Sequence, residues 1–190
     1  RPRPAGVVEP PRRTVTSAVD ALPSGRWAWA DIDLDAIAHN VGVLRAAVAP
    51  SAVWAVVKAD AYGHGAVSVA RTVLDAGAEG LCVALVQEAA ELRDALVDAP
   101  VLVLSEQPPS TAADAVRLGL ISTVYSVAQL DALAAAGAHR HRVQLKVDTG
   151  MHRVGCAPTD ALALAQEVER RDSVVLDGVF THLAVADEPS

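Results

Sequence analysis

The segment VWAVVKADAYGHG, residues 53–65, joins an apolar, valine-rich run to a lysine and then to a turn with two glycines. The run predicts a short strand, because β-branched residues bounded by glycine favour extended structure. Side chains alternate between the two faces of a strand, so Trp54, Val56 and Lys58 share one face. A primary amine at the end of a buried strand costs desolvation free energy unless a partner pairs or reacts with it.

The rhythm of a short strand followed by a helix repeats along the rest of the chain. Valine- and leucine-rich runs predict strands at 53–58, 80–86, 101–104, 121–125, 143–148 and 174–180. Alanine- and leucine-rich stretches predict helices at 66–76, 87–97, 109–118, 127–136 and 159–171. This alternation is typical of βαβ units and a parallel sheet. The Gly-x-Gly-x-x-Gly motif that would indicate a doubly wound nucleotide-binding fold does not follow the first strand. We predict an α/β fold, an incomplete (β/α)8 TIM-type barrel with about six of its eight βα units.

The chain divides into three parts by composition. Residues 1–25 are rich in proline and arginine without apolar periodicity, which predicts a disordered extension. Residues 26–50 predict a leading strand over RWAWADIDL and a helix whose N-terminus Asp35 caps. Residues 51–190 carry the repeating strand and helix pattern and form the barrel part.

Charge and cysteine content narrow the function classes. A net charge of −7 and a pI near 5.3 argue against nucleic acid or an anionic membrane as the main partner, and favour small-molecule chemistry. Cys82 and Cys156 lack metal-ligand spacing, so we expect two reduced thiols, no disulfide and no metal site. No apolar run approaches the roughly 20 residues that span a bilayer, and no signal segment is visible, so we expect a cytoplasmic protein.

Two lysines are expected at one end of the barrel. Lys58 ends the first barrel strand, and Lys146 alternates with apolar residues near the end of the fifth. The carboxyl ends of the strands form the active-site mouth in barrels of this type. A strand-end lysine can simply extend into solvent, or it can be an amine that bonds to a carbonyl compound. Position alone leaves both interpretations open.

Three further segments point to a known family. They are KADAYGHG at 58–65, KVDTGMHRVG at 146–155 and FTHLAVADE at 180–188, and each follows a predicted strand. Together with WADIDLDAIAHNV before the barrel they resemble the alanine racemase family, pyridoxal-phosphate enzymes of fold type III. The resemblance covers nearly everything from Trp27 to Glu188. It implies interconversion of L-alanine and D-alanine by two bases, supplying D-alanine for peptidoglycan, in a homodimer of the full-length protein.

The resemblance implies a role for five side chains. Lys58 would hold pyridoxal 5'-phosphate as an imine and act as the base for one enantiomer. Tyr62 would bond the cofactor phosphate, Arg153 the cofactor's phenolic oxygen and the substrate carboxylate, and His182 would lie near the cofactor ring. Lys146 would be carbamylated, which turns a cation into an anion that holds Arg153. Outside this context a packed tyrosine, a surface arginine and a structural histidine would be the ordinary interpretations.

Parts of the family pattern are missing from the chain. The second base is a tyrosine of the partner subunit in the family, whereas Tyr62 and Tyr125 match no such position. The C-terminal β domain and the last two barrel strands are absent, and the only methionine is Met151, so we expect a piece of a longer protein that is inactive and poorly stable alone. His152 stands where many relatives carry glycine or asparagine.

Other functions remain open on the sequence. A non-catalytic barrel that binds pyridoxal phosphate would carry the same lysine-bearing strand and lack the β domain. A related fold type III enzyme could act on another amino acid, such as serine or threonine. A barrel enzyme with unrelated aldehyde or metal chemistry is a third alternative, although no cluster of metal ligands is visible.

Overall fold

The computed structural model describes residues 29–186. The predicted disordered extension over 1–25 lies outside the described residues. All helices and strands belong to one compact unit, Ile32–Ser190. No helix within the described part of the chain is long and apolar enough to cross a bilayer.

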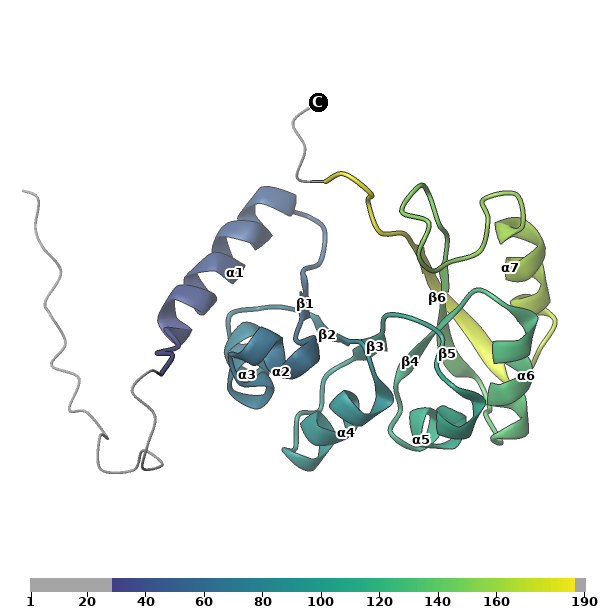
Figure 1. Cartoon of the computed structure of the whole chain (residues 1–190), viewed down its shortest axis with the longest axis horizontal. Helices are drawn as coiled ribbons and strands as arrows, with labels where there is room; N and C mark the ends of the chain where they lie inside the picture. Colours follow the sequence, from purple (N-terminus) through teal and green to yellow (C-terminus); the bar gives the residue numbers. More distant parts are fainter. Residues whose placement is uncertain (1–28, 187–190) are drawn as a thin grey trace, which may run out of the picture. The chain divides into compact units, whose positions relative to one another are not determined.

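Six parallel strands form one sheet in chain order, β1-β2-β3-β4-β5-β6 (Figure 1). The strands are β1 Trp54–Val56, β2 Gly80–Val83, β3 Val101–Val103, β4 Ile121–Val124, β5 His141–Lys146 and β6 Val174–Phe180. Each strand pairs in parallel with the next one along the chain. The predicted α/β architecture with sequential βα units is therefore confirmed, and β1 and β6 are the two edges of the sheet among the described residues.

Helices connect the strands, as the sequence pattern predicts. They are α1 Leu34–Val48, α2 Lys58–Gly63, α3 Ala66–Asp75, α4 Val86–Asp94, η2 Pro109–Thr111, α5 Ala112–Arg117, α6 Val127–Ala135 and α7 Ala161–Glu169. The Ser126 hydroxyl caps α6 by accepting from the Gln129 amide at 3.3 Å. The predicted helix at 109–118 is split into a 3-10 turn and a short α-helix, because Pro108 and Pro109 restrict the backbone at its start.

The predicted strand before the barrel is wrong in the described residues. Residues 29–33 have no regular structure, and α1 begins at Leu34. The cap is Asp33, whose carboxylate accepts from the Ala36 amide at 2.9 Å, and not Asp35. The alternating pattern of this segment suits a strand, but no neighbouring strand pairs with it in the described sheet. The chain therefore forms the helix capped by Asp33 and not a strand at this point.

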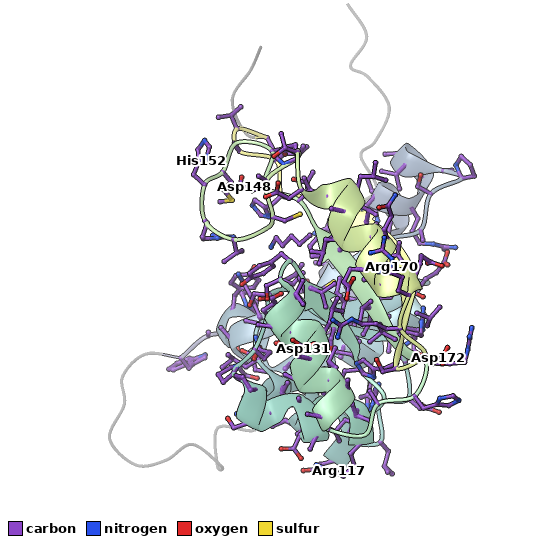
Figure 2. All side chains as sticks on the ribbon, turned by 90° about the vertical axis from the view of Figure 1, so that its right-hand side faces the viewer. Arg117, Asp131, Asp148, His152, Arg170 and Asp172 are labelled. Carbon is purple, nitrogen blue, oxygen red and sulfur yellow. The ribbon has the colours of Figure 1, made fainter. Side chains whose placement is uncertain are left out.

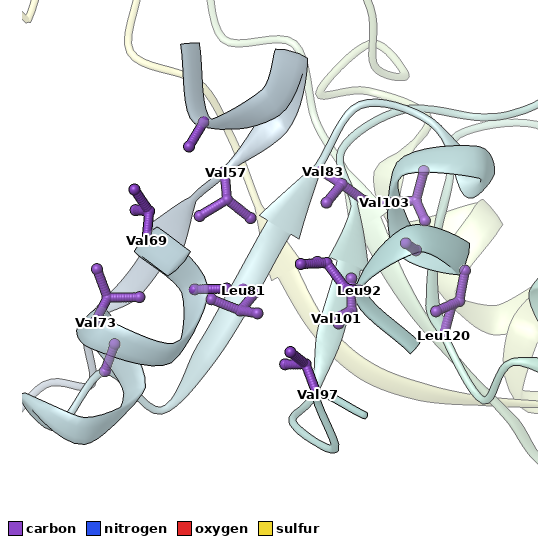
Figure 3. Close-up of a cluster of buried hydrophobic side chains, with 14 of the residues drawn as sticks. Val57, Val69, Val73, Leu81, Val83, Leu92, Val97, Val101, Val103 and Leu120 are labelled. Atoms are coloured by element: carbon purple, nitrogen blue, oxygen red, sulfur yellow. The ribbon is translucent and has the colours of Figure 1, made fainter. Parts of the chain in front are cut away.

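The two faces of the sheet carry different cores. On the outer face, helices α3 and α4 pack on the first three strands through a large cluster of buried valines and leucines (Figure 3). A second outer cluster joins α5, α6 and α7 to β4, β5 and β6. The inner face holds a smaller cluster that includes Trp54, Cys82 and Phe180. Val57 lies in the outer cluster and Trp54 in the inner one, which confirms the predicted alternation in β1.

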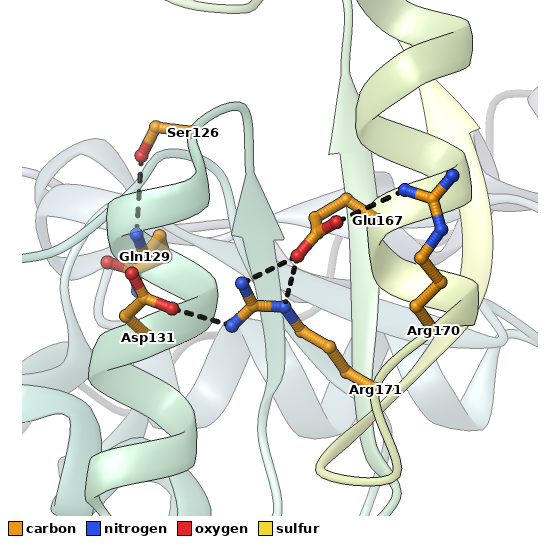
Figure 4. Close-up of polar contacts among 6 residues, drawn as sticks. All are labelled: Ser126, Gln129, Asp131, Glu167, Arg170 and Arg171. Atoms are coloured by element: carbon orange, nitrogen blue, oxygen red, sulfur yellow. Dashed lines mark hydrogen bonds and ion pairs between the residues drawn. The ribbon is translucent and has the colours of Figure 1, made fainter.

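An ion-pair network fastens α6 to the end of α7 (Figure 4). The Arg171 guanidinium donates to Asp131 Oδ1 at 2.6 Å and to Glu167 Oε1 at 2.7 and 3.0 Å. The hydrogen bonds from Arg171 lower the pKa of Glu167. Because a guanidinium offers a rigid fork of donors, one side chain satisfies both carboxylates. The network lies on the outside of the sheet, away from the inner face.

Candidate active site

A cavity of about 410 Å³ opens at the carboxyl ends of the strands. Its volume falls within the range of about 300–1,000 Å³ that is usual for small-molecule sites. All five side chains singled out by the sequence lie around it: Lys58, Tyr62, Lys146, Arg153 and His182. The cavity is therefore at the barrel end where the sequence predicts the chemistry.

Both lysines of the printed sequence lie at this cavity. Lys58 and Lys146 are the only two lysines of the printed sequence, and both line this cavity. The remaining basic side chains of the sequence are arginines. A lysine that merely extends into solvent could sit at any surface position, so the placement of both amines at one cavity favours a chemical role.

Lys58 begins a left-handed turn. The backbone leaves β1 with a last ladder bond from the Val57 amide to Cys82 O at 2.9 Å. The next four residues, Ala59–Tyr62, all have positive φ values between 51° and 57°. None is glycine, and each L-residue in this conformation costs about 1–2 kcal/mol. The sequence predicts a turn here, but nothing in its residue types indicates a left-handed one.

The left-handed turn puts Tyr62 beside Lys58. Lys58 Nζ lies 5.8 Å from the centre of the Tyr62 ring, within the range of a cation–π contact. Tyr62 is 61% exposed, so its ring borders the cavity instead of packing in the core. Among the described residues this ring is the one partner of the Lys58 amine.

Lys146 is a buried amine among cations. It is 4% exposed, and its Nζ donates to Leu104 O at 3.0 Å and lies 5.1 Å from the centre of the Phe180 ring. Burial lowers the pKa of Lys146, the positive charges of Arg153 and Lys58 lower it further, and Asp148 opposes the shift. The positive charges of Lys146 and Arg153 therefore oppose each other in the structure.

The loop that carries Arg153 folds back on the end of β5. The Asp148 amide donates to Cys156 O at 2.9 Å, and the Cys156 amide donates to Lys146 O at 3.0 Å. Gly155 has a φ of +131°, and a Cβ added there would lie 2.7 Å from Asp148 N. Only glycine allows the two chain segments to approach so closely.

Asp148 organises the start of the same loop. Its Oδ1 accepts from the amides of Gly150 and His152 at 3.0 Å each, and these bonds lower its pKa. His152 has a φ of +54°, a conformation that glycine and asparagine adopt readily. Figure 2 shows Asp148 and His152 close together on this loop, at the opposite end of the molecule from Arg117. Asp148 therefore shapes the turn.

His182 lies beyond the end of β6. The strand ends at Phe180, as its predicted range 174–180 has it, and His182 follows two residues later. Thr149 and Thr181 share a hydrogen bond of 2.7 Å between their hydroxyls, which links this segment to the loop after β5. His182 is exposed and lines the cavity.

The cavity is electrostatically positive. Lys58, Lys146 and Arg153 surround it, and within residues 29–186 none of the three forms an ion pair with a carboxylate. Apolar side chains complete the wall: Val56 and Phe180 at the ends of β1 and β6, and Leu104 directly after β3. The arrangement can hold a small anionic molecule with a reactive group near an amine.

Sequence reasoning missed a carboxylate that lies next to this site. The Glu88 carboxylate accepts from the amide of Ala59, next to Lys58, at 2.7 Å. It also accepts from Ala84 and Leu85, which precede α4. A glutamate at the third position of a helix that follows a strand is a capping signal, but the contact with Ala59 spans 29 residues and has no local signature.

Comparisons with known proteins agree with this geometry. Residues 32–190 match the family model described as alanine racemase, N-terminal domain. The alanine racemase of Desulfovibrio desulfuricans is 41% identical over 166 residues, which are 85% of this chain and 45% of that protein. The alanine racemase of Symbiobacterium thermophilum is 42% identical over 171 residues, 88% of this chain and 45% of that protein. The chain thus spans about 45% of the length of these relatives.

Solved structures of racemases are also similar to this chain. The crystal structure of alanine racemase from Bacillus anthracis with bound L-Ala-P has a TM-score of 0.80 and 35% identity, covering 89% of this chain and 45% of that one. A histidine racemase from Leuconostoc mesenteroides has a TM-score of 0.75 and 32% identity, covering 82% of this chain and 43% of that one. The chain therefore belongs to the alanine racemase family and carries that family's N-terminal barrel domain.

Proposed function

We propose that the full-length protein is a pyridoxal-phosphate-dependent racemase that interconverts L-alanine and D-alanine, with Lys58 as the residue that bonds to the cofactor. The observation that carries this proposal is the convergence of Lys58, Tyr62, Lys146, Arg153 and His182 on one cavity at the strand ends. The family membership supports it, since the family resemblance implies this cofactor and this reaction.

The cavity suits pyridoxal phosphate in charge and in size. A phosphate and a phenolate are anions, and three cations without carboxylate partners among the described residues surround the cavity. Tyr62 would donate its hydroxyl to the phosphate, Arg153 would face the phenolic oxygen, and His182 would lie near the ring. When bound, the cofactor supplies an electron sink for the charge left at the substrate α-carbon.

The chain's own residues would then orient the substrate and move one proton. Arg153 would hold the substrate carboxylate through its fork of donors, which fixes the α-carbon close to the Lys58 amine. Lys58 Nζ would take the α-proton from one face or return it there. Val56, Leu104 and Phe180 would keep water away from that amine.

A second base must serve the other face of the α-carbon. The chain holds only two tyrosines, Tyr62 at the cavity and Tyr125 in the outer cluster with α6 and α7. We infer that the partner subunit of a homodimer supplies the second base, as the family resemblance implies. The reaction would provide D-alanine for peptidoglycan in the cytoplasm, and the described chain alone would be inactive.

Lys146 would be carbamylated in the working enzyme. The ammonium group first loses one proton to solvent. The neutral nitrogen then attacks carbon dioxide, a nitrogen–carbon bond forms as one C=O π bond opens, and a second proton leaves to solvent, so that a cation becomes an anion. The lowered pKa of Lys146 favours the neutral amine that this step needs. The anion would then pair with Arg153. Intact-mass measurement with and without bicarbonate tests this step, and a mass unchanged at saturating bicarbonate would count against it.

A different amino-acid substrate is the second candidate. The similarity to a histidine racemase favours it, because the same barrel occurs in a protein named for another substrate. A non-catalytic protein that binds the cofactor is a further alternative, and it predicts cofactor binding without exchange of any α-proton.

The test follows α-hydrogen exchange in D₂O with the full-length protein. We expect deuterium incorporation and racemisation with alanine, faster than with serine, threonine or histidine. Lys58→Ala should abolish both, and Arg153→Ala should weaken substrate use more than cofactor binding. Arg117→Ala, at the opposite end of the molecule, is the matched control and should be unchanged (Figure 2). Racemisation retained in Lys58→Ala would refute the assigned role.

A further inference from the structure

The Glu88 carboxylate joins two strand ends beneath the candidate active site. Glu88 is the third residue of α4, and its Oε2 accepts from the amides of Ala84 at 2.7 Å and Leu85 at 3.0 Å. Its Oε1 accepts from the amide of Ala59 at 2.7 Å. One side chain therefore connects the turn after β1 to the turn after β2.

The amide that Glu88 holds belongs to the left-handed turn. Ala59 is the first of the four consecutive residues with positive φ. The second residue, Asp60, ties the turn to the start of α3, because its Oδ1 accepts from the Ala66 amide at 2.6 Å. A run of left-handed L-residues persists only where surrounding contacts compensate its cost. Two carboxylates provide such contacts: Glu88 binds the first amide of the turn, and Asp60 links the turn to α3.

The position of the Lys58 amine depends on this backbone. Among the described residues the amine has no hydrogen bond, and its partner is the ring of Tyr62, which the same turn carries. We propose that Glu88 is a positioning residue for Lys58, because it fixes the peptide that follows Lys58 and so directs the amine and the Tyr62 ring into the cavity. This inference rests on the proposed function, since it concerns the lysine that would bond to the cofactor.

A carboxylate suits this task better than its neutral analogues. Three amide donors converge on Glu88, and two carboxylate oxygens have lone pairs for all of them. Glutamine has one acceptor oxygen, and its NH₂ group would face another donor. Aspartate keeps the charge near the start of α4, but it is one methylene shorter and cannot reach Ala59 and Ala84 together.

The experiment compares Glu88→Gln and Glu88→Asp with wild type in the full-length protein. Glu91→Gln is the matched control, because Glu91 is an exposed glutamate on the same helix. The measurements are the Kd for pyridoxal phosphate by absorbance titration, the pH at which the absorbance of the bound cofactor changes, and the melting temperature. We expect the Kd to rise about tenfold to a hundredfold in Glu88→Gln. The absorbance transition should shift in both Glu88 variants, and Glu91→Gln should match wild type.

The outcomes for the two Glu88 variants test the positioning role of Glu88 separately from the proposed function. Wild-type Kd and wild-type absorbance transition in both Glu88 variants would overturn the inference. Failure of both variants to fold would overturn it as well, because Glu88 would then support the fold in general. If only Glu88→Gln fails to fold, Glu88→Asp decides by the same measurements. A wild-type protein that shows no cofactor absorbance marks the failure of the proposed function itself, and the positioning role falls with it.

Discussion

Replacing Gly155 by alanine should damage the function of the site more than the stability of the fold. Gly155 lies in the loop that carries Arg153 and has a φ of +131°. A Cβ there would be 2.7 Å from Asp148 N and 3.0 Å from Val147 C, so it would meet backbone atoms that cannot rotate away. The steric conflict must be relieved either by strain or by opening of the loop.

The magnitudes favour opening. An L-residue in such a conformation costs about 1–3 kcal/mol, and overpacking against backbone adds about 1–3 kcal/mol. Opening instead gives up the two backbone bonds between Cys156 and the end of β5, at about 1 kcal/mol each. The free energy of unfolding should therefore fall by only about 2–3 kcal/mol. Arg153 would then lose its fixed position, and KM for the amino acid should rise at least about tenfold.

Denaturant unfolding and steady-state kinetics of the full-length Gly155→Ala protein measure both effects. The matched control is Gly42→Ala, because Gly42 lies inside α1 and a Cβ there meets no atom within 4 Å. Alanine favours a helix interior over glycine by about 1 kcal/mol, so this variant should be as stable as wild type or more stable, with unchanged kinetics. Wild-type stability together with wild-type KM in Gly155→Ala would refute the reasoning about the loop.

Three further predictions concern stability. Gly80→Ala should lower the free energy of unfolding by about 1–3 kcal/mol, because a Cβ there would lie 2.6 Å from the Trp54 ring on the inner face. Denaturant titration measures this change, and an unchanged denaturant concentration at the unfolding midpoint would contradict it. Burial lowers the pKa of His141, so the neutral imidazole contributes its full stabilisation above the ordinary histidine pKa near 6.5, and this stabilisation is lost as the pH falls below 6.5. The melting temperature should therefore drop more steeply with acid in wild type than in His141→Gln. Parallel curves for the two proteins would contradict this. His152→Gly should raise the melting temperature by relieving a positive φ worth about 1 kcal/mol, and a lower value would show that the histidine stabilises the loop.

Much of the barrel follows from local pattern in the sequence. The last strand, Val174–Phe180, occupies its predicted range, and the alternation that sends Trp54 inward and Val57 outward is present. These features depend on side-chain periodicity, which a strand expresses residue by residue. The convergence of Lys58 and Lys146 follows from the same rule, because the carboxyl ends of parallel strands meet at one end of a barrel.

The features that could not be predicted depend on long-range contacts. The left-handed turn at Ala59–Tyr62 runs against the preference of its residue types, and the bond from Glu88 that supports it comes from another βα unit. The alternation around Trp29, in the segment before α1, favours a strand, yet residues 29–33 have no regular structure. The choice there depends on whether a partner strand is present, and the described sheet contains none for this segment.

Borohydride reduction of the full-length protein, followed by tryptic peptide mapping, tests the central claim most directly. Within the printed sequence the map must distinguish Lys58 from Lys146, which are its two lysines. We predict a yellow protein that loses its visible absorbance on reduction and carries the cofactor on the peptide with Lys58. A colourless protein, or cofactor fixed to Lys146, would contradict the account.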